Sequence, residues 1–184
     1  VGIKQTEKVF VYCGSLGEQY CWEEMYAIFT QYLNFDSNCR FLVLTGSPSF
    51  LNRKIDNCIE NKLIIKTVSA HEIPLYLNIA DIALAIRKPS YSMQGVAPIK
   101  LGEYLLMGLP TIASKGIGDT EELLQNLQGC FLYDHNDLNR IDHAIQWINS
   151  EKTDRIKLSQ LAKNKFSLEK SADDYLKALR SFDV

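Results

Sequence analysis

The chain has 184 residues, 46% of them hydrophobic and 23% charged, which is an ordinary composition for one globular domain. The 20 basic and 22 acidic residues give a formal net charge of −2. No segment combines clustered cations with aromatic residues, so the sequence does not indicate a nucleic-acid-binding protein. The longest apolar stretches, such as residues 82–86, fall far short of the roughly 20 residues that a membrane-spanning helix needs.

The N-terminus and the cysteines bear on the origin of the chain. The first residues lack an initiator Met and the apolar segment of a signal peptide, so we expect a piece of a longer protein. The five cysteines are odd in number and include no C-x-x-C pair. This usage favours small buried thiols in a reducing cytoplasm over a disulfide framework or a zinc site.

Short apolar runs alternate with longer amphipathic segments through most of the chain. In chain order, the pattern predicts a strand over 8–13, a helix over 22–33, a strand over 40–45, a helix around 50–60, a strand over 63–68, a short helix near 73–79, a strand over 82–86, a helix over 98–107, a strand over 110–113, a helix over 119–126 and a strand over 130–133. Three helices follow without a strand signal: one that carries Leu138, Ile141, Ala144, Ile145 and Ile148, then 156–166 and 168–182.

Six strands that alternate with helices require parallel pairing, because each crossover helix must cover one face of the sheet. Right-handed crossovers then give a Rossmann-like, doubly wound α/β fold with a helical C-terminal tail. No repeat or low-complexity tract divides the sequence, so we predict one domain over residues 1–184.

Ligands of such sheets bind beyond the carboxyl ends of the strands, so the loops after the strands hold the candidate site residues. The first loop comprises Gly14, Ser15, Leu16 and Gly17, and its two glycines allow backbone N–H groups to approach an anion closely. The spacing is not that of a G-x-G-x-x-G fingerprint, and a simple tight turn is the alternative interpretation.

The second loop, residues 87–97, precedes a helix that is predicted to open at Pro98. A helix N-terminus at this edge of a sheet suits an anion, and an anion would offset the unfavourable placement of Lys100 in the first turn. Spacing alone favours a simpler interpretation, a solvated ion pair between Lys100 and Glu103 on one helix face. Arg87 is expected to be solvated, with a phosphate contact as the alternative.

The third loop contains Gly116, Ile117 and Gly118, followed by Asp119 and Thr120, and helix capping by the last two residues would explain it. Three anion-permissive loops at one edge of one sheet are more persuasive than any one of them. The three histidines, His71, His135 and His143, have no metal-ligand spacing and are predicted to be structural or on the surface.

Residues 97–113, Ala-Pro-Ile-Lys-Leu-Gly-Glu-Tyr-Leu-Leu-Met-Gly-Leu-Pro-Thr-Ile-Ala, resemble the donor-binding motif of glycosyltransferase family 4 (group 1), whose members are GT-B-fold enzymes of bacterial polysaccharide assembly. The segments 12–17, 116–119 and 166–169 resemble other parts of the same domain. The resemblance thus covers nearly the whole chain and is most specific in its central motif.

The resemblance implies that the chain is the C-terminal, nucleotide-sugar-binding half of a two-domain GT-B enzyme. Glu103 would then accept hydrogen bonds from the ribose hydroxyls of a UDP- or GDP-linked sugar. The other implied contacts fall into three groups: the diphosphate at Gly14, Ser15, Leu16, Gly17, Pro98, Ile99 and Lys100; the base at Thr67, Val68 and Ser69; and the donor sugar at Ser92, Gly95, Gly116, Ile117 and Gly118.

The family resemblance also implies a retaining hexosyltransferase that needs no metal and no cofactor, so positive groups and helix dipoles must stabilise the leaving diphosphate. Two positions depart from the family pattern. Gly95 stands where many members carry the first of two glutamates, and Ala97 stands where Ser is usual. The N-terminal acceptor domain is expected to be missing, so catalytic residues stay unassigned and the chain alone should be inactive.

Two other functions remain open: a half-domain of a nucleotide-sugar epimerase on the same fold, and a non-catalytic nucleotide-binding module. The expected partners are a nucleotide-sugar donor, the missing N-terminal domain and a glycan or lipid-linked acceptor, with no nucleic acid. We expect a cytoplasmic location, with the inner face of the membrane as the alternative for the full-length protein, although this half shows no basic amphipathic helix.

Overall fold

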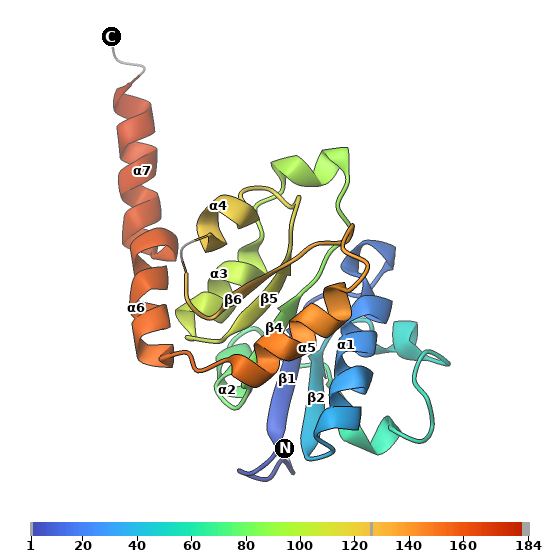
Figure 1. The fold of residues 1–184 in the computed structure, drawn as a ribbon. Coiled ribbons are helices and arrows are strands. Elements are labelled where there is room, and N and C mark those ends of the chain that lie inside the picture. The colour runs from blue at the N-terminus through green and yellow to red at the C-terminus, as the bar shows by residue number, and fades with distance from the viewer. Residues whose placement is uncertain (1, 126, 182–184) are drawn as a thin grey trace.

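A parallel β-sheet forms the centre of the molecule (Figure 1). The computed structural model describes residues 2–125 and 127–181, and within these its six strands run in the order β3-β2-β1-β4-β5-β6. The strands are β1 (Lys8–Cys13), β2 (Cys39–Leu44), β3 (Leu63–Lys66), β4 (Ile82–Ala85), β5 (Thr111–Ser114) and β6 (Cys130–Tyr133). All neighbouring strands pair in parallel, which confirms the predicted doubly wound sheet.

Helices cover both faces of this sheet (Figure 1). They are α1 (Trp22–Phe35), α2 (Ile73–Leu77), α3 (Ile99–Leu106), α4 (Thr120–Leu124), α5 (Arg140–Ser150), α6 (Arg155–Phe166) and α7 (Leu168–Arg180). Single-turn 3₁₀ helices lie at η1 (Glu18–Tyr20), η2 (Pro48–Leu51), η3 (Glu60–Lys62) and η4 (Tyr91–Gly95). In the part of the chain that the structure describes, every helix is too short or too polar to span a bilayer.

The alternation of side chains along β1 divides the core into two layers. Phe10 and Tyr12 point to the layer that α1 and α5 cover, whereas Val9 and Val11 point to the layer of α2, α3, α4 and α6. All four residues are buried, as expected for a central strand with helices on both faces. This burial fixes the register of β1 and therefore the position of the loop that follows it.

The strand order places the topological switch point between β1 and β4. From β1 the chain proceeds outward to β2 and β3, and then returns to β4 on the other side of β1. The crossovers that leave these two strands diverge, so a crevice forms beyond their carboxyl ends. The loop after Cys13 and the loop after Ala85 border this crevice.

Two sequence predictions about helices were wrong. Residues 50–60 form no α-helix but two 3₁₀ turns joined by a loop, because Arg53 adopts a left-handed backbone conformation (φ 63°) that interrupts any helix. Leu138 lies before α5 and is 92% exposed, so it does not belong to the buried stripe of that helix. The predicted helix ends at Asn126 and Phe182 fall outside the described residues.

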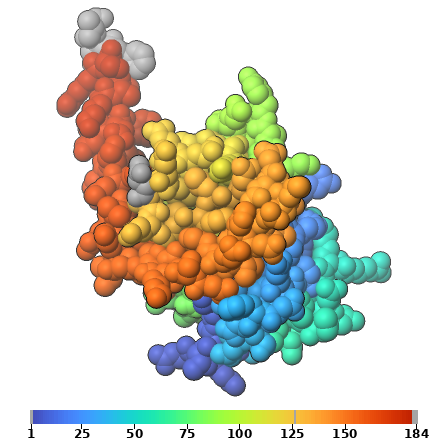
Figure 2. Space-filling model, in the orientation of Figure 1, coloured from blue at the N-terminus to red at the C-terminus, as the bar shows by residue number. Residues whose placement is uncertain are grey.

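The last helix, α7, extends away from the body of the molecule (Figure 2). This helix has no buried residue. Its neighbour α6 packs against the body of the molecule through Leu158 and Ala162, which lie in the core. The cysteines are all free: Cys13 and Cys39 are buried, Cys21 and Cys130 are half-buried, and Cys58 is exposed. The expectation of buried thiols therefore holds for part of the set only.

Candidate functional site

Lys100 lies at the switch point because α3 is fastened to the end of β1. The hydroxyl of Tyr104 accepts a hydrogen bond from the backbone N–H of Cys13 (2.7 Å), and both residues are buried. Lys100 lies one helical turn before Tyr104, on the same face of α3. Its ammonium donates to the hydroxyl of Tyr12 (3.1 Å) and lies 4.2 Å from the centre of that ring.

Gly14 is required where Lys100 crosses the end of β1. Its φ of +145° is unfavourable for residues with a side chain, and an added Cβ would lie 2.6 Å from the ammonium nitrogen of Lys100. The predicted glycine turn therefore has a structural reason. It makes room for a cation from α3 beside the first loop.

Arg87, at the end of β4, is the second cation of the crevice. Its backbone N–H donates to the buried hydroxyl of Ser114 (3.0 Å). Its guanidinium carbon lies 5.0 Å from the ring centre of Tyr20, and the ammonium of Lys100 lies 4.8 Å from the same ring. The Nε atom of Arg87 is buried and has no hydrogen-bond partner within the described residues.

Neither cation is neutralised by a carboxylate. The ion pairs between residues that the structure describes include neither Lys100 nor Arg87. Burial, with a smaller contribution from the charge of Arg87, lowers the pKa of Lys100 to about 8. A half-buried positive charge without a counter-ion is costly, so this crevice suits an anion.

The crevice provides a small cavity and free backbone donors. Tyr20, Arg87, Lys100, Ile117 and Thr120 are among the residues that line a cavity of about 140 Å³. In the first loop, the N–H groups of residues 15–17 have no acceptor among the described residues. They are successive backbone donors of the kind that binds phosphate oxygens.

The start of α3 offers fewer donors than predicted. The helix begins at Ile99 rather than Pro98, and no side chain caps it. The N–H groups of Ile99 and Leu101 already donate to the carbonyls of Ala97 (3.0 Å) and Pro98 (2.9 Å). The diphosphate contacts of Pro98 and Ile99 stay predictions: both residues line the cavity beside Lys100, but neither has a free backbone N–H group.

Glu103 projects from the exposed side of α3. Its carboxylate makes no hydrogen bond or ion pair to another described residue, so the predicted alternative, an ion pair with Lys100, does not form. Lys100 instead turns toward Tyr12 and Tyr20. An exposed carboxylate without a structural partner is available to a ligand.

The three residues assigned to the base follow β3 at the same edge of the sheet. Thr67 donates through its hydroxyl to the carbonyl of Thr45 (2.7 Å). Ser69 donates through its N–H (2.9 Å) and its hydroxyl (2.6 Å) to Glu72, and these hydrogen bonds hold the pKa of Glu72 below its usual range. Val68, between them, is half-buried. The side chains of Thr67 and Ser69 are thus engaged, which leaves backbone groups for base contacts.

The residues assigned to the donor sugar come together from two loops. The N–H of Gly118 donates to the carbonyl of Met93 (2.8 Å), which joins the third loop to η4, where Ser92 and Gly95 lie exposed. Gly118 has φ +48°, and a Cβ would lie 2.1 Å from the carbonyl oxygen of Val96, so this contact requires glycine.

Gly116 and Ile117 occupy the two sides of the third loop. Gly116 lines a separate polar cavity of about 500 Å³, whereas Ile117 is buried and lines the crevice. The predicted capping by Asp119 does not occur, since the side chain of this N-cap residue makes no cap hydrogen bond. Capping therefore does not explain the third loop.

Sequence reasoning missed the aromatic half of the site. Tyr12 and Tyr20 hold the cations, but both cations come from distant segments, so no local spacing reveals the contacts. It also missed the role of His135, whose Nε2 lies 3.0 Å from the hydroxyl of Ser114 that holds the backbone of Arg87. The run Tyr-x-Gly ending the first strand was the available signal, and it does not identify a cation site by itself.

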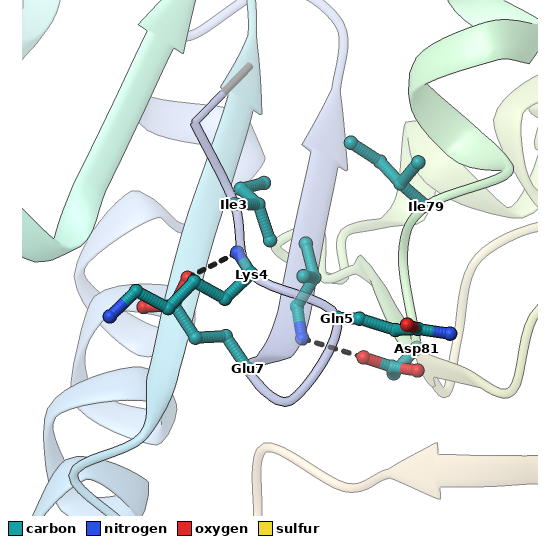
Figure 3. A pocket seen from close by; sticks show the side chains of 7 residues that line it. Ile3, Lys4, Gln5, Glu7, Ile79 and Asp81 are labelled. Atoms are coloured by element: carbon teal, nitrogen blue, oxygen red, sulfur yellow. Dashed lines mark hydrogen bonds between the residues drawn. The ribbon is translucent and has the colours of Figure 1, made fainter.

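Another cavity, of about 400 Å³ and thus larger than the one at Lys100 and Arg87, lies at the opposite edge of the sheet (Figure 3). Its acidic groups are already used: Asp81 accepts from the N–H of Val9 (2.7 Å), and Glu7 accepts from the N–H of Lys4 (2.7 Å) and from Arg40 (2.8 Å). These hydrogen bonds fasten the segment before β1 to its neighbours. The carboxylates of this wider cavity are thus matched, and its lysine, Lys4, is exposed.

Comparisons with known structures find the same fold. The C-terminal domain of the glycosyl transferase group 1 family protein LpcC from Francisella tularensis is 15% identical with a TM-score of 0.67, over 88% of this chain and 87% of that one. Anabaena HepE, solved in complex with UDP and glucose, is 16% identical with a TM-score of 0.69, over 96% of this chain and 49% of that one. S. aureus TarM, in a complex that includes UDP, is 16% identical with a TM-score of 0.69, over 96% of this chain and 37% of that one.

These neighbours confirm the predicted half of a GT-B fold, and the chain spans less than half the length of HepE and TarM. A search of curated proteins finds no match. The family model described as glycosyl transferases group 1 matches residues 1–165. Because this match covers most of the chain, the protein belongs to the glycosyl transferases group 1 family.

Proposed function

We propose that this chain is the nucleotide-sugar donor-binding half of a glycosyltransferase. The observation that carries the proposal is the pair of half-buried cations without a carboxylate partner, Arg87 and Lys100, at the switch point of the sheet. A diphosphate supplies the missing negative charge, and the free N–H groups of residues 15–17 supply further donors beside it. Family membership makes a nucleotide-linked sugar the natural source of that diphosphate.

The positions of the ribose, the base and the sugar follow from the residues along the carboxyl edge of the sheet. Glu103, exposed and unpaired next to Lys100, binds the ribose hydroxyls. The base lies over residues 67–69, where backbone groups make the contacts. The sugar lies where η4 and the third loop meet, close to Gly95 and Gly118. The complexes of HepE and TarM, both described with UDP, favour a uridine nucleotide for this chain as well.

In the reaction, the cation pair stabilises the negative charge that develops on the departing diphosphate. We propose that transfer proceeds without a metal, because the two cations provide the charge stabilisation that a metal would otherwise supply. Retention of configuration is proposed on the family resemblance alone. The acceptor, a glycan or a lipid-linked glycan of a bacterial surface polysaccharide, binds to a preceding domain. Five free cysteines fit a cytoplasmic location.

Gly95 bears on the binding of the donor sugar more than on the binding of the nucleotide. It is exposed on η4, and a Cβ there would have no atom within 4 Å, so a longer side chain would fit. The position of the family glutamate is thus open space in this chain. This observation favours a second candidate, a nucleotide-binding module without transfer activity. Product analysis with the full-length protein separates the candidates: a new glycoside, a rearranged nucleotide sugar or no turnover.

Binding of UDP, GDP and ADP to the purified chain tests the proposal directly, with backbone amide NMR as the readout. We expect shifts confined to the first loop, the start of α3 and the third loop. In Glu103→Ala, one nucleotide should bind about tenfold more weakly at unchanged stability, because an exposed unpaired carboxylate contributes to binding and not to folding. Asp119→Ala, at another exposed acid of the same edge, is the matched control and should bind like the wild type.

Two results would contradict the proposal. No shift with any nucleotide at millimolar concentration would exclude donor binding by this chain. Shifts gathered instead around the cavity of residues 3–9 and 79–81 would assign the ligand to the opposite edge. Glycosyl transfer by the 184-residue chain alone would contradict the separate claim that the preceding domain is needed for the reaction.

A further inference from the structure

Tyr20 is the one aromatic ring that contacts both cations among the cation–aromatic pairs of the described residues. The ammonium of Lys100 lies 4.8 Å from its centre, and the guanidinium carbon of Arg87 lies 5.0 Å from it. Tyr12 contacts Lys100 alone. Since both cations carry the same sign and neither has a carboxylate partner, something must keep them together before an anion arrives.

The backbone on both sides of Tyr20 holds its ring in this position. The carbonyl of Gln19, the residue before it, accepts the N–H of Lys88, the residue after Arg87 (2.9 Å). The two segments that carry the ring and the guanidinium are therefore joined directly. The residue after Tyr20, Cys21, has φ 42° and ψ 49°, a left-handed conformation that is strained for any residue except glycine. Strain of this kind persists only where its surroundings impose it.

The face of an aromatic ring carries partial negative charge, so it attracts a cation without neutralising it. A carboxylate between Arg87 and Lys100 would form ion pairs that a ligand must break. Tyr20 instead lowers the energy of both cations and leaves their hydrogen-bond donors available. The Nε of Arg87, buried and without a partner, is one such donor.

We propose that Tyr20 is a positioning residue that holds Arg87 and Lys100 together as a preformed clamp for a nucleoside diphosphate. This inference rests on the proposed function, since it assumes that the diphosphate binds at these two cations. Tyr20 acts through the cations and needs no contact with the ligand. Its hydroxyl makes no hydrogen bond to another described residue, so the ring is the part that matters.

Three substitutions test the proposal through the affinity for the nucleotide that the wild type binds. Tyr20→Phe keeps the ring and should bind within about twofold of the wild type. Tyr20→Leu keeps apolar bulk but removes the ring face, and should bind about tenfold more weakly, as expected when desolvated cation–aromatic contacts are lost. Tyr26→Leu, on α1, is the control: Tyr26 stacks on Trp22 and touches neither cation, so affinity should stay unchanged.

Ring-fluorinated phenylalanines at position 20 provide a readout that a merely structural role would not change. Fluorine withdraws charge from the ring face while the shape stays nearly the same, so affinity should fall stepwise with each added fluorine. This series also keeps the test decisive if Tyr20→Leu does not fold. Wild-type affinity in Tyr20→Leu, or equal affinity across the fluorinated series, would overturn the role of Tyr20. A wild-type chain that binds no nucleotide would instead overturn the proposed function.

Discussion

The two edges of the sheet treat charge in opposite ways. At the amino edge, the carboxylates of Glu7 and Asp81 accept hydrogen bonds from backbone N–H groups, and Arg40 pairs with Glu7. At the carboxyl edge, Arg87 and Lys100 face only aromatic rings, a hydroxyl and an open cavity. The carboxylates of the first edge are matched by hydrogen-bond donors, whereas the two cations of the second edge have no carboxylate partner among the described residues.

Whether a charged group already has a partner distinguishes structural from ligand-binding polar groups better than cavity volume does. Cavity volume does not identify the site: a cavity of about 400 Å³ lies at the amino edge, another of about 500 Å³ lies beside Gly116 at the carboxyl edge, and the cavity at the two cations measures only about 140 Å³. A satisfied charge contributes to folding, whereas an unmatched buried charge costs stability and is retained for what it binds. The variants below test this distinction, beginning with the largest expected effect.

Removing the charge of Lys100 should have the largest effect on binding. In Lys100→Met, which keeps the length of the side chain, we expect nucleoside diphosphate affinity to fall about 50-fold, as for the loss of a hydrogen bond to a charged group. The free energy of unfolding at pH 7 should stay equal or rise by about 1 kcal/mol, because a half-buried cation without a carboxylate partner is removed. Calorimetry and urea unfolding measure the two quantities.

Lys88→Met is the matched control for Lys100→Met. Lys88 is exposed beside Arg87, so its loss changes the net charge by the same amount without emptying the crevice. Affinity should change less than about threefold, as for a screened surface charge. Equal losses in the two variants would mean that only the general field of the edge matters and that Lys100 has no specific role.

Gly14→Ala should have the next largest effect. The added methyl group would lie 2.6 Å from the ammonium of Lys100, at a φ of +145° that alanine tolerates poorly, so the lysine must move. We expect affinity to fall about 20-fold and the free energy of unfolding to drop by about 1–2 kcal/mol. Gly46→Ala, at the end of β2 on the same edge, has no atom within 4 Å of its added Cβ and should behave like the wild type. Unchanged binding in Gly14→Ala would show that Lys100 need not occupy this position.

Most of the fold could be predicted from the sequence because the four inner strands of the six-stranded sheet are almost entirely buried on both faces, and the edge strands β3 and β6 are partly buried. Such strands appear as short apolar runs, and all six were found within two residues of their bounds. The failure at residues 50–60 has a local cause: Arg53 takes a left-handed conformation that no sequence pattern announces.

The site was predictable only in part. Its location followed from parallel topology, and Lys100 and Gly14 were named because each belongs to a recognisable loop or motif. Tyr20 was not assigned a role, and a phosphate contact of Arg87 was only the alternative to a solvated side chain. The importance of both residues arises from contacts between segments more than 60 residues apart in sequence, 20 with 87 and 20 with 100. Sequence reasoning also expected an ion pair of Lys100 with Glu103, since helical spacing does not show that the end of β1 offers Lys100 a better position.

The pH dependence of binding provides a third test of the carboxyl edge. Burial lowers the pKa of Lys100 to about 8, whereas a bound diphosphate favours the protonated amine. Affinity should therefore be full well below pH 8, where the amine is protonated, and fall about tenfold as the pH rises from 7.5 to 9.5, a range above the phosphate ionisation near pH 6. Lys100→Arg stays charged and should show a flat profile. A flat profile in the wild type would mean that Lys100 keeps its proton or does not contact the diphosphate.

Asp81 tests the amino edge, where the expected effect is smallest and concerns stability alone. Asp81→Ala leaves the buried N–H of Val9 without its acceptor, so the free energy of unfolding should fall by about 1 kcal/mol in urea unfolding. Asp81→Asn keeps an acceptor oxygen and should recover most of that loss. Nucleotide affinity should be unchanged in both variants, because Asp81 already accepts a backbone hydrogen bond and lies at the edge opposite the two cations. A loss of affinity in folded Asp81→Ala would remove the distinction between the two edges, since a satisfied carboxylate would then serve the ligand.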